Sequence, residues 1–308
     1  MNFLERTLDH QNQWWKYLIV IVVGFIGGQL LGSLPLFGII AYKVGASGGT
    51  LAPNPESMMD LTVLGISNNV ALLLLILPFL VSLIAIVLLI KVLHKRTFAE
   101  TVNGTRKIRF GRIGAGFAVW VALMLLYFVG DYLINSENFV WQFNFAAFIP
   151  LFFIAILLIP IQTTCEEVVF RGYLTQGIAA WTRNRLLAII LPGLIFALVH
   201  AFNPEVHEFG FWVAMPQYIF FGLVFGLLSV LDDGIELACG MHAANNIFLA
   251  MFVTHKSAAI QTDAVFEQLN LNPIKDTLVL IVIGIVATAY FAYRYKWDFS
   301  VLTKKVEA

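Results

Sequence analysis

Two adjacent glutamates and an arginine occur in a part of the chain that is otherwise almost wholly apolar. The run TTCEEVVFRGYL places Glu166, Glu167 and Arg171 directly after the segment FIPLFFIAILLIPIQ. An acidic side chain at the centre of a bilayer costs about 2.5–3.5 kcal/mol, so such residues usually face a cavity or a partner. In a helix, Glu167 and Arg171 pair on one face, whereas Glu166 is rotated by about 100° and stays available for chemistry. The structural alternative is a charge cluster that only marks a helix end.

Two histidines and an asparagine occur on further apolar segments. His200 ends the segment LPGLIFALVH, and His242 and Asn246 share a helix face in GIELACGMHAANN because they are four residues apart. Imidazoles bind metals, a carboxylate acts as a general base and an amide steadies an oxyanion, so with Glu166 these are the components of a metal-activated water. Taken singly, His200 could instead be a hydrogen-bonded core residue, and His242 with Asn246 a polar contact between helices.

The two cysteines, Cys165 and Cys239, lie in apolar context and lack the spacing of a disulfide framework or a CxxC pair. Cys165 competes as a nucleophile because it adjoins Glu166, and His200 could act as its base. Water is nevertheless favoured, since neighbours on a helix point about 100° apart and a thiol in apolar surroundings is a poor nucleophile. The remaining histidines fall in tails or at loop edges and are predicted to face solvent: His10, His94, His207 and His255.

The elements that must position these residues are membrane spans. Of 308 residues, 59% are hydrophobic and only 12% charged, against roughly a quarter charged in soluble domains. A net charge of zero implies no attraction to nucleic acid. We predict an all-α polytopic membrane protein with a single membrane domain, 1–308, and a catalytic core of helices 4–7, 143–254. About eight spans are predicted: 17–42, 70–93, 113–134, 143–165, 187–202, 211–231, 235–254 and 276–295.

The distribution of basic residues predicts the orientation of these spans. Sixteen of the nineteen Lys and Arg residues fall on one side, and the positive-inside rule places that side, with both termini, in the cytosol. His200 then lies near the outer end of the fifth span, whereas the glutamates follow the inner end of the fourth. Residues around one water must share a depth, so we expect the fourth helix to continue past Pro160 to about Trp181.

In their order along the chain, these segments resemble a known family. EEVVFR resembles the EExxxR motif of the CPBP intramembrane proteases (CAAX prenyl endopeptidases and bacteriocin-processing, or Abi, proteins), and FALVH resembles their FxxxH motif. FGLVFGLLSVLDDGIELACGMHAANN resembles their glycine-containing sixth helix leading to HxxxN. Within it, Gly222 and Gly226 are four residues apart, which predicts close packing on a neighbouring helix. The motifs cover residues 163–246, about a quarter of the chain.

The resemblance implies a hydrolase, specifically an intramembrane metalloendopeptidase that cleaves membrane-associated or lipid-modified peptides. Its expected partners are such a substrate and the lipid bilayer. Glu166 would activate the attacking water, and Glu167 would support the site through Arg171. The water, or a metal beside it, would be held by His200, His242 and Asn246.

A zinc ion is the favoured cofactor, with His200 and His242 as its ligands. Catalytic zinc takes three protein ligands and a water. Two imidazoles and one carboxylate would supply the three protein ligands. A metal-free mechanism stays open, because Glu166 cannot easily be both a ligand and a free base. Glu167 could be the third ligand, but its pairing with Arg171 would then weaken.

Two other functions would use the same polar cluster. A transporter or channel could use it as an ion or proton path, but transporters often contain paired repeats with broken helices, and the sequence shows no such symmetry. A non-catalytic scaffold could keep the family's fold. The complete set of Glu166, His200, His242 and Asn246 argues against a scaffold.

Overall fold

The computed structural model describes residues 3–48, 61–105, 107–258 and 261–307 of the chain. Nearly all regular structure in these ranges is helical, and the strands that they contain form one small sheet. The apolar runs therefore correctly predicted the all-α class.

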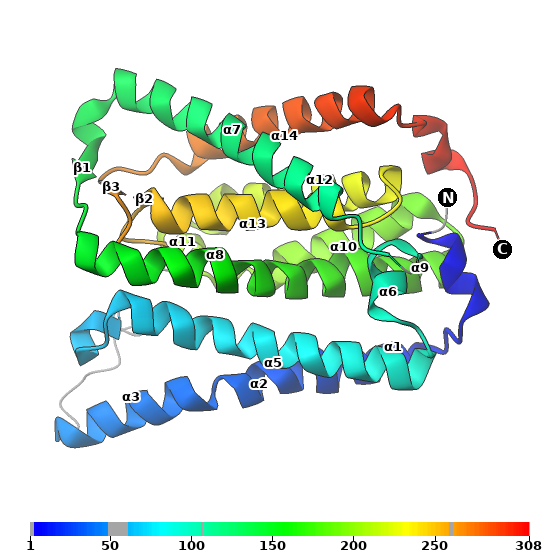
Figure 1. Ribbon diagram of the computed structural model, residues 1–308, viewed down its shortest axis with the longest axis horizontal. Helices are drawn as coiled ribbons and strands as arrows, with labels where there is room; N and C mark the ends of the chain where they lie inside the picture. The colour runs from blue at the N-terminus through cyan, green and yellow to red at the C-terminus, as the bar shows by residue number, and fades with distance from the viewer. Residues whose placement is uncertain (1–2, 49–60, 106, 259–260, 308) are drawn as a thin grey trace.

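The N-terminal part of the chain forms a layer at one side of the molecule (Figure 1). Its first span contains a π-helical segment and packs along the second. The elements of this layer are α1 (Trp14–Ile19), η2 (Val20–Ile26), α2 (Gly27–Gly32), α3 (Leu34–Ala46), η3 (Leu61–Leu64) and α5 (Asn68–His94). Two further short helices, η1 (Glu5–Asp9) and α6 (Phe98–Asn103), pack on the main bundle, against α9 (Thr175–Thr182) and η5 (Val168–Leu174) respectively.

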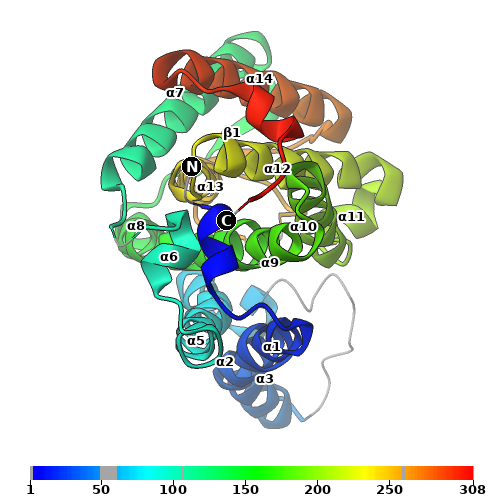
Figure 2. The same cartoon turned by 90° about the vertical axis from the view of Figure 1, so that its right-hand side faces the viewer.

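Helix α13 (Glu236–Met251) lies in the middle of the molecule, with other helices around it (Figures 1 and 2). Fourteen of its sixteen residues are buried, so this helix has almost no face toward lipid. The helices that surround it, with their short connections, are α7 (Phe110–Ile134), η4 (Ser136–Asn138), α8 (Phe145–Glu167), η5 (Val168–Leu174), α9 (Thr175–Thr182), α10 (Arg185–Val199), α11 (Pro204–Phe209), α12 (Phe211–Leu231), α14 (Pro273–Tyr295) and η6 (Phe299–Thr303).

A three-stranded sheet closes the end of the bundle opposite the termini (Figure 1). Its strands are β1 (Phe139–Trp141), β2 (Val253–Thr254) and β3 (Phe266–Gln268). The order is β1-β3-β2, with β1 antiparallel and β2 parallel to β3. Since β2 follows α13 after a single residue, the sheet anchors this end of the central helix.

Within the described ranges, six helical stretches are long and apolar enough to cross a membrane. They confirm a polytopic membrane protein, and they are Trp14–Ala46, Asn68–His94, Phe110–Ile134, Phe145–Thr182, Phe211–Leu231 and Pro273–Tyr295. Helices α10 and α13 occupy the other two predicted spans but have only 15 and 16 residues, against the roughly 20 that a bilayer core requires. A count of eight crossings therefore stays a prediction.

The fourth span continues well beyond the glutamates, as the sequence predicted. Helices α8, η5 and α9 form one helical stretch from Phe145 to Thr182, which places Glu166 close to its midpoint. The segment η5 is π-helical and begins directly after Glu167. π-Helical turns inside α-helices are often found at functional sites.

Glycines bring the site helices close together. A Cβ atom on Gly222 of α12 would collide with the backbone of Gly193 on α10, and one on Gly226 would touch Ile189. This contact confirms the predicted close packing of the sixth helix. A second close approach joins α7 to α13, where Cβ atoms on Gly116 or Gly240 would collide with carbonyl groups of the other helix.

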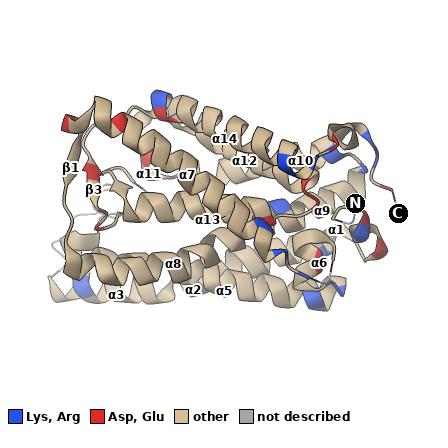
Figure 3. Cartoon of the chain, turned by 45° about the horizontal axis from the view of Figure 1, so that its top comes forward, with Lys and Arg blue, Asp and Glu red and all other residues tan. Residues whose placement is uncertain are grey.

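Both termini lie at the same end of the molecule (Figures 1 and 2). Lys and Arg gather at this end, whereas the long helical stretches toward the sheet carry few (Figure 3). Arg109 and Arg112 pair there with Asp232 in the turn before α13, at 3.3 and 3.1 Å. The charge distribution along the fold thus matches the one that the positive-inside argument used.

One histidine that the sequence placed in solvent is fully buried. His94 ends α5, where its Nδ1 lies 2.7 Å from the carbonyl oxygen of Gln11 and its Nε2 lies 2.7 Å from the hydroxyl of Tyr173. The prediction was wrong because the N-terminal segment folds over the end of α5. His207 is exposed, and His10 and His255 are half-buried.

Candidate active site

Glu166 is a buried carboxylate with one oxygen bonded and the other free. Its side chain is 6% exposed, and Oε1 accepts a hydrogen bond from Gln162 Nε2 at 2.7 Å. The other oxygen, Oε2, has no hydrogen-bond partner among the described residues and lies 3.6 Å from His242 Nε2. A polar contact of this length is one that a single water can bridge.

One carboxylate oxygen of Glu167 accepts hydrogen bonds from both Arg171 and His242. Its Oε1 accepts from Arg171 Nη1 at 2.9 Å and lies 2.8 Å from His242 Nδ1. The predicted pairing of Glu167 with Arg171 is therefore present, with both side chains almost fully buried. Because a carboxylate oxygen can only accept, His242 Nδ1 donates to Glu167, and the other ring nitrogen, Nε2, faces Glu166.

Arg171 is held by hydrogen bonds at both terminal nitrogens and by two aromatic rings. Besides Glu167, its guanidinium donates to the carbonyl oxygen of Phe221 at 3.0 Å. Its central carbon lies 4.0 Å from the ring centroid of Phe196 and 5.5 Å from that of Phe225. These contacts position the arginine beside Glu167. The carboxylate of Glu167 and the faces of the two aromatic rings stabilise its buried positive charge.

His200 lies beside this network and is not hydrogen-bonded to it in the part of the chain that the structure describes. Its Nδ1 lies 2.7 Å from the carbonyl oxygen of Phe196, so Nδ1 is the donor of this bond. The ring of Phe196 separates the two histidines, with centroids 4.4 Å from His200 and 6.2 Å from His242. On its other side, His200 stacks on Tyr218 at 4.6 Å.

Asn246 joins the network through its amide. Its Nδ2 donates to Gln162 Oε1 at 3.1 Å, and its Oδ1 accepts from Asn245 Nδ2 at 3.1 Å. The structure thus brings five of the predicted residues together between α8, η5 and α13, in two hydrogen-bonded groups: Arg171–Glu167–His242, and Glu166 with Asn246 through Gln162. The two groups face each other across the 3.6 Å between His242 Nε2 and Glu166 Oε2. His200 reaches this cluster only through the shared ring of Phe196.

Zinc stays a prediction. His200 and His242 each donate through Nδ1, an arrangement typical of metal ligands, and Glu166 Oε2 is an unpartnered oxygen. Among the described residues, however, no group of three His, Cys, Asp or Glu side chains is close enough to hold a metal ion. The residues therefore do not form a zinc site as they are arranged.

Two neighbours of the site escaped the sequence analysis. Gln162 lies one turn before Glu166, and the same four-residue spacing that paired Glu167 with Arg171 could have found it. Tyr218, which stacks on His200, looks like any aromatic of an apolar helix, and only the packing of α12 on α10 identifies it. Cys165 belongs to an apolar cluster with Val168, among others, and is fully buried.

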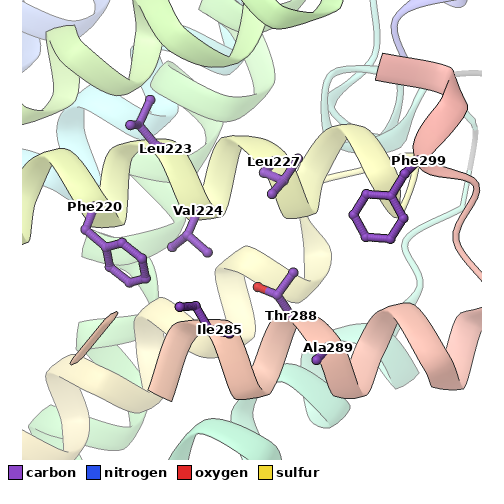
Figure 4. Close-up of a pocket in the computed structure, with 8 residues that line it drawn as sticks. All are labelled: Phe220, Leu223, Val224, Leu227, Ile285, Thr288, Ala289 and Phe299. Carbon is purple, nitrogen blue, oxygen red and sulfur yellow. The ribbon is translucent and has the colours of Figure 1, made fainter. Parts of the chain in front are cut away.

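An apolar groove lies away from this polar cluster. It has a volume of about 400 Å³ and lies between α12 and α14 (Figure 4). Its lining is Phe220, Leu223, Val224, Leu227, Ile285, Thr288, Ala289 and Phe299. None of these residues is a candidate for chemistry, so the candidate site is the buried cluster and not this groove.

Comparison with known proteins identifies the core. Residues 145–248 match the family model of the type II CAAX prenyl endopeptidase Rce1-like proteins. The chain is also similar to the uncharacterized protein YyaK of Bacillus subtilis (strain 168), with 29% identity over 299 residues, which are 96% of this chain and 97% of that protein. No solved structure matches significantly. The matched segment contains all six predicted site residues, so the resemblance to the CPBP (CAAX prenyl endopeptidase) family that the motifs indicated is confirmed over residues 145–248.

Proposed function

We propose that the protein is an intramembrane endopeptidase in which Glu166 activates the attacking water. The observation that carries the proposal is the free Oε2 of Glu166, a buried carboxylate oxygen that faces His242 Nε2 across 3.6 Å. Buried polar atoms without a partner are rare, and in an enzyme they are candidates for a catalytic role. A water between these two atoms has an acceptor on each side.

The proposed reaction is hydrolysis of one peptide bond. As the water oxygen attacks the carbonyl carbon, Glu166 Oε2 takes its proton, and His242 Nε2 orients the same water. The tetrahedral intermediate collapses when the peptide C–N bond breaks and Glu166 returns the proton to the departing amine. The products are a carboxylic acid and an amine, and Glu166 is a carboxylate again.

Two supporting groups are proposed around this reaction. The amide of Asn246 has a second N–H, because only one is used toward Gln162, and that N–H can stabilise the oxyanion. Glu167 and Arg171 hold His242 in the tautomer that presents Nε2. The apolar walls exclude other water, which strengthens these interactions.

The proposed substrates are membrane-associated or lipid-modified peptides. A site at the midpoint of a membrane span meets chains that enter from the bilayer. A substrate helix must unwind before its scissile bond is exposed, because the carbonyls of an intact helix are bonded internally. Segments with glycine or proline are therefore favoured.

The test compares membrane peptides from cells that express the wild type or Glu166→Gln. The amide cannot take a proton, so fragments that depend on the wild type should disappear with the variant. Purified protein in detergent should then cleave a synthetic peptide that spans one of the mapped sites. Identical peptide profiles for the two proteins would contradict the proposed function and favour a scaffold or a transport role.

A further inference from the structure

A chain of four hydrogen bonds leads from a tryptophan on α7 to the carboxylate of Glu166. Trp120 Nε1 donates to Asn245 Oδ1 at 3.3 Å, and Asn245 Nδ2 donates to Asn246 Oδ1 at 3.1 Å. Asn246 Nδ2 donates to Gln162 Oε1 at 3.1 Å, and Gln162 Nε2 donates to Glu166 Oε1 at 2.7 Å. We call this path, through α7, α13 and α8, the amide relay.

The direction of the amide relay is set at its far end. The indole N–H of Trp120 can only donate, so Asn245 must turn its oxygen toward Trp120 and its NH₂ toward the next amide. Asn246 and Gln162 then follow the same orientation, because an acceptor must meet each donor. The group that finally meets Glu166 is therefore an N–H donor and not a carbonyl oxygen.

Burial strengthens the hydrogen bonds of the amide relay. Trp120 is fully buried, and Gln162 and Asn245 are less than a tenth exposed. In such surroundings, linked hydrogen bonds polarise one another, and a donor bound to a carboxylate forms the stronger, charge-assisted kind of bond. The close approach of α7 and α13 at Gly116 and Gly240 brings the tryptophan within reach of the amides.

We propose that Gln162 is a positioning residue for the general base, and that Trp120, Asn245 and Asn246 hold its amide in the working orientation. The inference rests on the proposed function, since Glu166 is taken as the base. Gln162 occupies Oε1, stabilises the carboxylate form that can accept a proton, and leaves Oε2 turned toward His242. Asn246 gains a second task, because its oxygen and one N–H serve the relay.

The first test replaces Gln162 by methionine, which has a similar length and volume but no hydrogen-bonding amide. The assay uses a quenched fluorescent peptide that spans a site cleaved by the wild type. Loss of a hydrogen bond to a charged group should lower kcat about 10- to 100-fold, with KM unchanged within about twofold. Thr163→Val is the matched control: this neighbour is buried too, but its hydroxyl bonds only to Pro160 within its own turn.

The second test asks whether the two ends of the relay act together. Trp120→Phe keeps an aromatic ring and removes the indole N–H that donates to Asn245, so kcat should fall. The double variant Trp120→Phe with Gln162→Met should have the same kcat as Gln162→Met alone. The melting temperature gives a readout that needs no peptidase activity. The two variants should lower it non-additively, because members of one hydrogen-bond network couple, whereas Trp120→Phe with Thr163→Val should be additive.

The outcomes separate this inference from the function on which it rests. Full kcat in Gln162→Met, or additive losses of melting temperature with Trp120→Phe, overturns the amide relay. Cleavage that is equal in the wild type and in Glu166→Gln overturns the proposed function, and the melting-temperature cycle still decides the relay. A parallel rise of KM in Gln162→Met would assign this residue to substrate binding and also contradict the inference.

Discussion

At the scale of single residues, the two glutamates differ in what surrounds them. Glu167 is bonded to Arg171 and His242 through one oxygen, so its charge is compensated. Glu166 receives one amide donor, and its Oε2 faces His242 Nε2 across 3.6 Å. In both glutamates Oε2 lacks a hydrogen-bond partner among the described residues. Adjacent residues of one helix point about 100° apart, and this rotation alone divides the pair into a support and a candidate base.

The nucleophile can be tested by two substitutions. Cys165→Ser should keep most peptidase activity, because the thiol lies in an apolar cluster, whereas Glu166→Gln should lose nearly all of it. Cleavage of a membrane peptide by both purified variants measures this, with size-exclusion chromatography as the check of folding. An inactive serine variant together with an active glutamine variant would indicate a thiol peptidase.

Arg171→Ala should destabilise the protein as well as inactivate it. Its removal leaves the buried charge of Glu167 without its main partner, which typically costs about 3–5 kcal/mol. Thermal unfolding in detergent measures the loss. Lys304→Ala is the control, because Lys304 and Asp298 form an exposed pair, whose loss should leave the melting temperature nearly unchanged. A stable but inactive Arg171→Ala protein would mean that the arginine contacts the substrate.

The metal content of the purified protein tests the zinc prediction. If His200 and His242 are ligands, the wild type should contain about one zinc ion per chain, and His200→Ala or His242→Ala should lose it. Elemental analysis by mass spectrometry measures the stoichiometry. Zinc that can be removed without loss of peptidase activity would leave the mechanism to Glu166 and water alone.

At the scale of elements, close helix contacts and one π-helical turn arrange the site. Gly193 with Gly222, and Gly116 with Gly240, let α10, α12, α7 and α13 approach to backbone contact. The sequence predicted the first contact from a four-residue spacing of small residues. It could not predict the amide relay, because a relay depends on the relative heights of three helices that are far apart in the chain.

Gly222→Ala should lower stability even though alanine is the better helix former. A Cβ atom there collides with the backbone of Gly193, which cannot give way as a flexible side chain does. Overpacking of this kind typically costs about 1–3 kcal/mol. Gly38→Ala in α3 is the matched control, since a Cβ atom there meets nothing within 4 Å. It should raise or keep the melting temperature, and equal behaviour of the two variants would contradict the contact.

At the scale of the whole molecule, the chain is a bundle around one buried helix, with charges gathered where the termini lie. Most spans, and the extension of the fourth helix to Thr182, were predictable because long apolar runs have few other outcomes in a membrane. The burial of His94 was not, because it depends on a terminal segment that folds back over α5. Helix α13 is apolar and almost wholly surrounded by protein, so whether it crosses the bilayer stays a prediction.

The orientation of the molecule in the membrane stays a prediction that reporter fusions can test. A fluorescent protein fused to the C-terminus should fluoresce, and alkaline phosphatase at the same position should be inactive, because the basic end is expected in the cytosol. Fusions after α7, at the end that carries the sheet, should behave in the opposite way. Active phosphatase at the C-terminus would invert the assignment.

The path from Trp120 to Glu166 has an electrical consequence. Protons cross membranes along waters, carboxylates and imidazoles, each of which can take up one proton and release another. Indole and carboxamide groups do not exchange protons in this way, and the path contains nothing else. These groups therefore orient the carboxylate of Glu166 through hydrogen bonds but do not conduct a proton from Glu166 toward α7. A cell could keep such a base in the middle of a charged membrane without a leak along this route.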